Sequence, residues 1–200
     1  MSGFVAACRT LGRDIAVSLR GIAQLTFGRA DGIRVFENDR EMASRSFIAA
    51  LFSFPIFLLF RYLDWLSGAV PTEGTHALAL DLLSFPISWA GFALLSLPLL
   101  RALGLEAAWP RYLVAWNWCN FAQYILLLVS SLPLSLHAPS IFAQTSALVG
   151  YGWALWLEWY VARLVLNTTP LTAAVIVAAD VAFGALVSLM PTLPLTHLSF

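Results

Sequence analysis

Long apolar runs separated by short polar segments dominate the chain after residue 46. A helix that crosses a bilayer needs about 20 mostly apolar residues. Five runs reach that length, with turn-forming Gly, Pro and Ser between them, at 47–66, 77–100, 112–132, 141–166 and 171–190. This pattern predicts an all-α, polytopic membrane protein. Its regions would be a cytoplasmic segment at 1–46, a five-helix transmembrane bundle at 47–190 and an outer-side tail at 191–200.

The leading segment has a different periodicity. On a helical wheel one face carries the apolar residues Phe4, Cys8, Leu11, Ile15, Leu19 and Ile22. The opposite face carries Arg9, Arg13 and Arg20. Such a helix is typical of those that lie in the plane of an anionic membrane. We therefore predict an N-terminal amphipathic interfacial helix whose three Arg residues bind the membrane surface. The alternative is a helix docked on a partner protein or on the cytoplasmic ends of the bundle.

Arginine residues are distributed unevenly among the polar segments. Every cation is Arg, and seven of the eleven lie in the first 45 residues. Arg101, Arg111 and Arg163 fall near helix ends on the same predicted side of the membrane. Because cytoplasmic segments carry the excess of Arg and Lys, the N-terminus is expected inside and the C-terminus outside. Arg61 is the exception, and we expect it to pair with Asp64, one turn away.

Composition excludes several functions. Hydrophobic residues make up 60% of the chain and charged residues 11%, whereas soluble domains average about 25% charged residues. The formal net charge is zero, which argues against nucleic-acid binding, since that requires a basic surface. Two Cys form no disulfide framework. We find no nucleotide loop, nucleophile motif, HExxH or CxxC, so no enzymatic activity and no cofactor are predicted.

A few polar residues fall inside the predicted helices. Glu158 and Asp180 each lie about nine residues from the inner ends of their helices, which places both roughly 13 Å deep. We predict a buried polar cluster formed by Asn117, Asn120, Tyr124, Glu158, Arg163 and Asp180. Two interpretations stay open. The carboxyl groups could form a proton-carrying pair, or Arg163 could neutralise one of them while the Asn side chains link helices.

The motif Ser-Phe-Pro-Ile occurs at 53–56 and again at 84–87. Pro55 and Pro86 lie near the middle of adjacent helices, and each removes one backbone hydrogen bond. We predict helix kinks at both, with Ser53 and Ser84 bonding the freed carbonyls. Broken helices can surround a transport site, but the polar residues lie on other helices. We therefore expect the kinks to serve packing.

Two further patterns concern helix contacts and metals. Ala174, Ala178 and Ala182 form a small-residue row suited to close helix contact, and Trp159 is placed for a cation–π contact with Arg163. All three His residues fall in predicted outer segments, at His76, His137 and His197. They could bind a metal only if these segments converged. Ordinary loop histidines are the simpler interpretation, so no metal is predicted.

The segment GRADGIRVFENDREMASRSFIAALFSFPIFLL, which covers most of 26–59, follows the amphipathic helix. Together they resemble a group of uncharacterised small bacterial inner-membrane proteins. That group has a basic lead helix, a Gly-Asp-Gly-like turn, an acidic stretch with Phe, and an RSF-x-AA entry into the first span. Five spans with a cytoplasmic N-terminus are also similar to Yip-type membrane proteins, in topology alone. The resemblance implies the bacterial inner membrane and transfers no functional residue.

We therefore expect a multi-pass inner-membrane protein without catalytic chemistry. Its predicted role is that of a membrane scaffold or an accessory subunit of a larger membrane complex. The expected partners are membrane lipids, with other membrane subunits or a second copy of the chain as further candidates. The alternative is a proton-coupled small-solute transporter that uses Glu158 and Asp180.

Overall fold

The computed structural model describes residues 2–66, 74–136 and 138–189, and every regular element in these ranges is helical. The side chains of residues 2–4, 64, 66 and 74–78 are not described. Each predicted apolar run coincides with one long helix. In chain order the elements are α1 (Ser2–Thr26), η1 (Ala30–Val35), α2 (Arg40–Arg45), α3 (Ile48–Leu66), α4 (Gly74–Ala102), η2 (Glu106–Ala108), α5 (Trp109–Ser135), α6 (Ser140–Val165) and α7 (Pro170–Ser188).

Four helical stretches are long and apolar enough to cross a membrane: Arg40–Leu63, Ala79–Ala102, Glu106–Ser135 and Pro170–Ser188. They correspond to α3, α4, α5 and α7. The fifth expected span, α6, is as long as the others but is not among these four. Its sequence contains Gln144, Glu158 and Arg163 together with several Trp and Tyr residues, and these lower its mean hydropathy.

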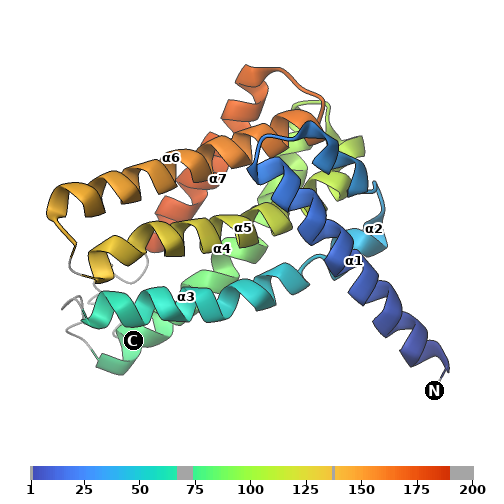
Figure 1. The fold of residues 1–200 in the computed structure, drawn as a ribbon. Coiled ribbons are helices and arrows are strands. Elements are labelled where there is room, and N and C mark those ends of the chain that lie inside the picture. The colour runs from blue at the N-terminus through green and yellow to red at the C-terminus, as the bar shows by residue number, and fades with distance from the viewer. Residues whose placement is uncertain (1, 67–73, 137, 190–200) are drawn as a thin grey trace, which may run out of the picture.

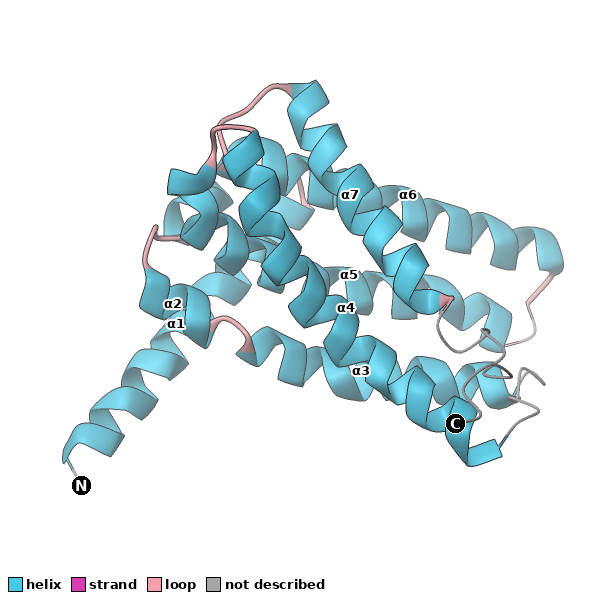
Figure 2. Cartoon of the chain, turned by 180° about the vertical axis from the view of Figure 1, so that it is seen from behind, coloured by secondary structure: helices cyan, strands magenta, loops and turns pink. Residues whose placement is uncertain are grey.

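The long helices form two layers. Figure 1 shows α3, α5 and α6 running alongside one another, with α5 in the middle. Figure 2 shows α4 and α7 crossing the other face of this layer at a slant, side by side. Small residues allow close approach between helices: a Cβ atom on Gly91 of α4 would collide with Phe183 of α7, and one on Gly150 of α6 with Ser130 of α5. Small residues at helix contacts are typical of membrane bundles, where packing rather than water drives association.

The two Ser-Phe-Pro-Ile motifs meet in space. Phe54 of α3 contacts Phe85 of α4 edge-on, with ring centroids 5.3 Å apart. Pro55 and Pro86 are both exposed and lie inside continuous helices, with no unwound backbone. The predicted role of Ser53 and Ser84 is wrong in detail. Their hydroxyl groups donate to Ala49 O and Asp81 O, which are not the carbonyls that the prolines free. The repeated motif therefore serves aromatic packing between α3 and α4.

The C-terminal part of α1 docks against the bundle. Its residues Ser18, Ile22 and Leu25 are buried, and α1 contacts α5, α6 and η1. A Cβ atom on Gly21 would collide with Val35 and with Gly32, so only glycine lets η1 fold back onto α1 at this point. The N-terminal half extends away from the bundle (Figure 1). Docking on the bundle was the alternative interpretation of this helix, and it holds for the C-terminal part.

Candidate functional site

A pair of carboxyl groups lies at the contact between α6 and α7. Glu158 of α6 is only 6% exposed, and it shares a hydrogen-bonding contact with the Asp180 carboxyl group of α7. The connection between the two helices is tight. Asn167 adopts a positive φ of 46° after α6, and the Thr169 hydroxyl caps α7 by accepting from Thr172 N at 3.1 Å. This short turn makes α6 and α7 neighbours and brings the two acids to one level.

One face of α5 forms the wall opposite the pair. Tyr112, Trp116, Cys119 and Gln123 follow a helical i, i+4, i+7, i+11 spacing and therefore share a face. Trp116 Nε1 donates to Asp180 Oδ2 at 2.6 Å. Gln123 Nε2 donates to Ala154 O at 2.8 Å and lies 3.4 Å from Glu158 Oε2. The sequence interpretation missed Trp116 and Gln123, although their spacing along α5 was a usable signal.

Two polar atoms in this region lack hydrogen-bond partners among the described residues. They are Glu158 Oε1 and the Tyr112 hydroxyl oxygen. Tyr112 is 1% exposed, and both carboxyl groups lie within electrostatic range of its hydroxyl group. Buried polar atoms are almost always hydrogen-bonded in folded proteins. Both unpartnered atoms lie where α5, α6 and α7 meet, so this region contains two buried polar atoms without hydrogen-bond partners in the described chain.

Arg163 is a correction to the predicted cluster. Its side chain is exposed, and its guanidinium carbon lies 5.4 Å from the centroid of the Trp159 ring. The predicted cation–π contact is thus present. Within the described chain, no ion pair joins an Arg to Glu158 or Asp180. Arg163 lies one turn beyond Trp159 at the end of α6, where the ring and solvent attract it away from the bundle interior.

The remaining members of the predicted cluster form a second network. Asn117 is fully buried; its Oδ1 accepts from Trp89 Nε1 and its Nδ2 donates to Ser46 Oγ, both at 2.7 Å. Tyr124 stacks on Trp89, with ring centroids 6.2 Å apart. Asn120 donates to Trp116 O within its own helix at 3.0 Å. These residues link α4 and α5 to the turn between α2 and α3, whereas the acids lie at a neighbouring face of α5 and contact α6 and α7. The single predicted cluster is therefore two separate ones.

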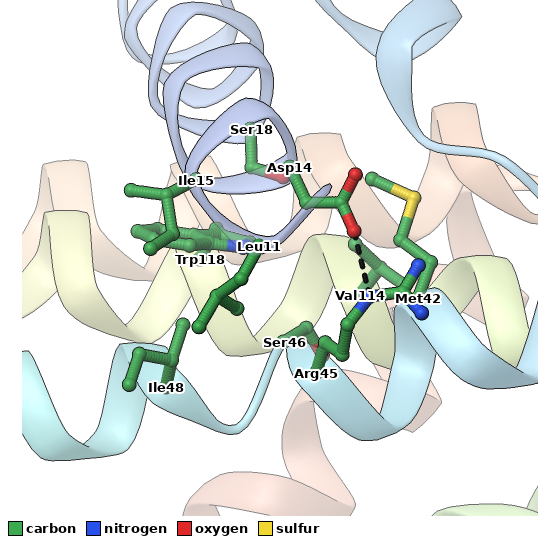
Figure 3. A pocket seen from close by; sticks show the side chains of 10 residues that line it. All are labelled: Leu11, Asp14, Ile15, Ser18, Met42, Arg45, Ser46, Ile48, Val114 and Trp118. Carbon is green, nitrogen blue, oxygen red and sulfur yellow. Dashed lines mark hydrogen bonds and ion pairs between the residues drawn. The ribbon is translucent and has the colours of Figure 1, made fainter. Parts of the chain in front are cut away.

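A third polar group joins α1 to α2 (Figure 3). Arg45 Nε donates to Asp14 Oδ2 at 2.8 Å, and Arg45 Nη1 lies 3.1 Å from Glu41. Beside them is a small pocket with room for about one water molecule. The buried Ser18 hydroxyl lines this pocket and has no partner among the described residues. A pocket this small is consistent with a bound water and excludes an organic ligand.

Asp39 caps the start of α2. Its carboxylate accepts from Met42 N at 2.9 Å and from Glu41 N at 3.3 Å. The bond from Met42 N, then that from Glu41 N, and the nearby Arg45 charge lower the pKa of Asp39 below its ordinary value. The charged stretch before α3 is thus a capped helical turn, as expected for a segment beginning with Asp.

The predicted surface residues Arg9, Arg13 and Arg20 are all exposed on α1. The end of this helix is held against α6, where Trp153 Nε1 donates to Thr26 O at 3.2 Å and Tyr160 donates to Gly28 O at 2.8 Å.

Between the spans, Arg61 Nε lies 3.1 Å from Asp81 Oδ1 of α4. The expected partner of Arg61, the Asp64 side chain, lies outside the described residues.

The histidine hypothesis also lies outside the described residues, because the side chains of His76, His137 and His197 are not among them. In the described part of the chain, no group of three or more His, Cys, Asp or Glu side chains could hold a metal ion.

Comparisons with protein-family models, curated proteins and solved structures found no match. The family resemblance therefore stays a prediction, and the function has to be inferred from the residues themselves.

Proposed function

We propose that this chain is a multi-pass inner-membrane protein that acts as a scaffold or accessory subunit of a larger membrane complex. The observation that carries the proposal is the small-residue row of α7. Ala174, Ala178 and Ala182 are exposed, while the buried residues of α7 are Ala173, Ile176, Val177 and Val187. The row expected to pack inside the bundle instead faces outward.

An outward small-residue row suits contact with another protein. Lipid chains are as apolar as leucine, so membrane helices gain little from hydrophobicity when they associate. They gain from close backbone approach, which Ala and Gly permit. A row of three alanines on an exposed face of α7 offers such an approach to a helix of a partner subunit or of a second copy.

The proposed membrane arrangement adds α6 to the four apolar helices as a fifth span. Two hydrogen bonds support an antiparallel α5–α6 hairpin, Ser146 Oγ to Ser130 O at 2.9 Å and Gln123 Nε2 to Ala154 O. With five crossings and the Arg-rich segments inside, the N-terminus is cytoplasmic and the C-terminus periplasmic. The exposed Arg9, Arg13 and Arg20 on the free part of α1 would contact anionic lipid headgroups.

The test is association of the full chain in native membranes. The tagged protein is purified in mild detergent, and its associated subunits and oligomeric state are measured. Ala178→Leu should reduce association because a larger side chain blocks close approach. Ala90→Leu, on an exposed face of α4, is the matched control and should leave association unchanged. A monomer without associated protein, in wild type and both variants, would contradict the proposal.

A second function, a proton-coupled small-solute carrier, is favoured by one specific observation. Glu158 and Asp180 contact each other, and no Arg within the described chain is paired with either. The test is solute uptake into vesicles that contain the purified protein, driven by an imposed pH gradient. Asp180→Asn should abolish uptake without reducing expression. If this variant transports normally, the carrier function is wrong.

A further inference from the structure

Glu158 and Asp180 differ in the hydrogen bonds that they receive from neighbouring residues. Asp180 Oδ2 receives a short bond of 2.6 Å from Trp116 Nε1. Glu158 Oε2 has only the 3.4 Å contact with Gln123, and Glu158 Oε1 has no donor among the described residues. The two carboxyl groups nevertheless contact each other. Two carboxylates cannot form a hydrogen bond, because neither has a hydrogen to donate.

Among the described residues, no cation is paired with either carboxyl group. On α4, which packs against α7, Asp81 is paired with Arg61 and Arg101 with Glu106. On α5 the facing titratable groups are Tyr112 and Cys119, both neutral hydrogen donors and both fully buried. On α6 the nearest cation, Arg163, is exposed and lies over Trp159. Trp116 and Gln123 are neutral donors. A pair of ionised carboxylates in such a place would repel each other strongly, since a buried environment screens charge poorly.

We propose that Glu158 and Asp180 form a binding site for a single proton, with the proton carried by Glu158 and donated to Asp180. Glu158 is the donor because its Oε1 has no other partner, whereas Asp180 already accepts a short bond of the kind that carboxylates form. The Asp180 carboxylate then accepts two hydrogen bonds, one from Trp116 Nε1 and one from the Glu158 hydroxyl group. Every carboxyl group in it then has a hydrogen-bond partner.

The Tyr112 hydroxyl is the second observation that points to a proton site. It lies one turn nearer the start of α5 than Trp116, is buried, and has no partner among the described residues. A hydroxyl group can both donate and accept a proton. Tyr112 lies on the same face of α5 as Trp116, and its unpartnered hydroxyl group is a candidate to exchange the proton with the pair.

The proton site does not depend on the accessory role. It deepens the carrier alternative by naming Glu158 as the residue that holds the coupling proton. A negative result for the proton site would leave the accessory role unaffected, and a negative result for the accessory role would leave the proton site unaffected. The site is measured on the purified protein alone, whereas the accessory role is measured by association with other subunits and the carrier role by uptake.

The test is infrared spectroscopy of the full chain in lipid vesicles at about pH 7, where exposed carboxyl groups are ionised. We expect an absorption band of one protonated carboxyl group in the wild type. Glu158→Gln should remove the band and keep the protein folded, because the Gln amide can still donate to Asp180. Asp180→Asn should keep the band and move it to higher frequency, because the accepting carboxylate is replaced.

Asp81→Asn provides the matched control, since Asp81 is paired with Arg61 at 3.1 Å and lies outside the pair. This variant should leave the band unchanged. Spectra in sodium chloride and in choline chloride should be identical. Absence of the band in the wild type, its persistence in Glu158→Gln, or its loss on adding sodium would each overturn the proposal. Circular dichroism verifies that each variant retains its helices.

Discussion

Asn117 is hydrogen-bonded through both the oxygen and the nitrogen of its side-chain amide. It is fully buried and joins α4 to the turn between α2 and α3 by bonding both Trp89 and Ser46. Asn117→Leu would leave the Trp89 indole N–H without an acceptor. A buried donor without a partner costs about 1–3 kcal/mol. We expect the free energy of unfolding, measured in mixed detergent micelles, to fall by this amount.

Asn120 provides the comparison for Asn117, because it lies almost one turn further along α5. Its amide donates only to Trp116 O of its own helix. Asn120→Leu should therefore cost less than about 1 kcal/mol. If the two variants destabilised the protein equally, the bonds from Asn117 to other helices would not be the cause.

The Asp39 cap predicts a pH dependence of stability. The pKa of Asp39 is lower in the folded protein than its ordinary value of 3.8, so the folded state favours the carboxylate. A lowered pKa stabilises the fold above the ordinary value, and the contribution is lost as the pH falls through the folded value. Asp39→Asn retains a capping oxygen that does not titrate. We expect the wild type to lose stability relative to this variant as the pH falls from about 5 to below the ordinary value of 3.8.

The measurement for Asp39 is the midpoint of thermal unfolding of both proteins at several pH values. The difference between the two should be constant near neutral pH and should change only in the acid range. A difference that stays constant throughout would mean that the bonds from Met42 N and Glu41 N do not favour the ionised form. Arg45, 3.9 Å from Asp39, contributes in the same direction.

At the scale of elements, the docking of α1 depends on one close approach. A Cβ atom on Gly21 would collide with Val35 and lie 2.8 Å from Gly32 O. Overpacking of a tight contact costs about 1–3 kcal/mol. Gly21→Ala should therefore release η1 and the C-terminal part of α1. We expect faster trypsin cleavage at Arg20 and Arg29 in detergent and a lower unfolding temperature.

Gly12→Ala is the matched control on the same helix. A Cβ atom at Gly12 has no neighbour within 4 Å, and alanine in a helix is favoured over glycine by up to about 1 kcal/mol. This variant should leave trypsin cleavage unchanged and stabilise α1 slightly. Opposite effects of the same substitution on one helix would establish that the contact with η1, rather than helix propensity, holds α1.

The positions of the helices could be predicted from the sequence, but not the direction in which each one faces. The length of each apolar run placed α3 to α7, because a bilayer requires a minimum apolar length. Helical spacing also showed that Ala174, Ala178 and Ala182 share a face. It could not show that this face is exposed, because lipid is as apolar as a protein interior. For the same reason Asn117 and Asp180 were assigned to one cluster, although Asn117 bonds to Trp89 and Ser46 and Asp180 bonds to Trp116.

At the scale of the whole molecule, the number of crossings determines the side on which the C-terminus lies. Four helical stretches are long and apolar enough to cross a membrane. If only these cross, both termini lie on the same side. If α6 also crosses, as its pairing along α5 supports, the termini lie on opposite sides. We predict five crossings, because a helix that follows α5 through Ser130 and Gln123 has to pass through the same membrane depth.

The measurement is a pair of C-terminal fusions in bacterial cells. Alkaline phosphatase becomes active only outside the cytoplasm, because it requires disulfide bonds. Green fluorescent protein serves as the reporter for the inside. We expect an active phosphatase fusion and a dark fluorescent one. Truncation after Leu136, before α6, removes two of the five crossings and should leave the phosphatase active, whereas truncation after Asn167 should make it inactive. If the fusions at Leu136 and Asn167 behaved alike, α6 would not cross, and Glu158 and Asp180 would not lie at one depth in the membrane.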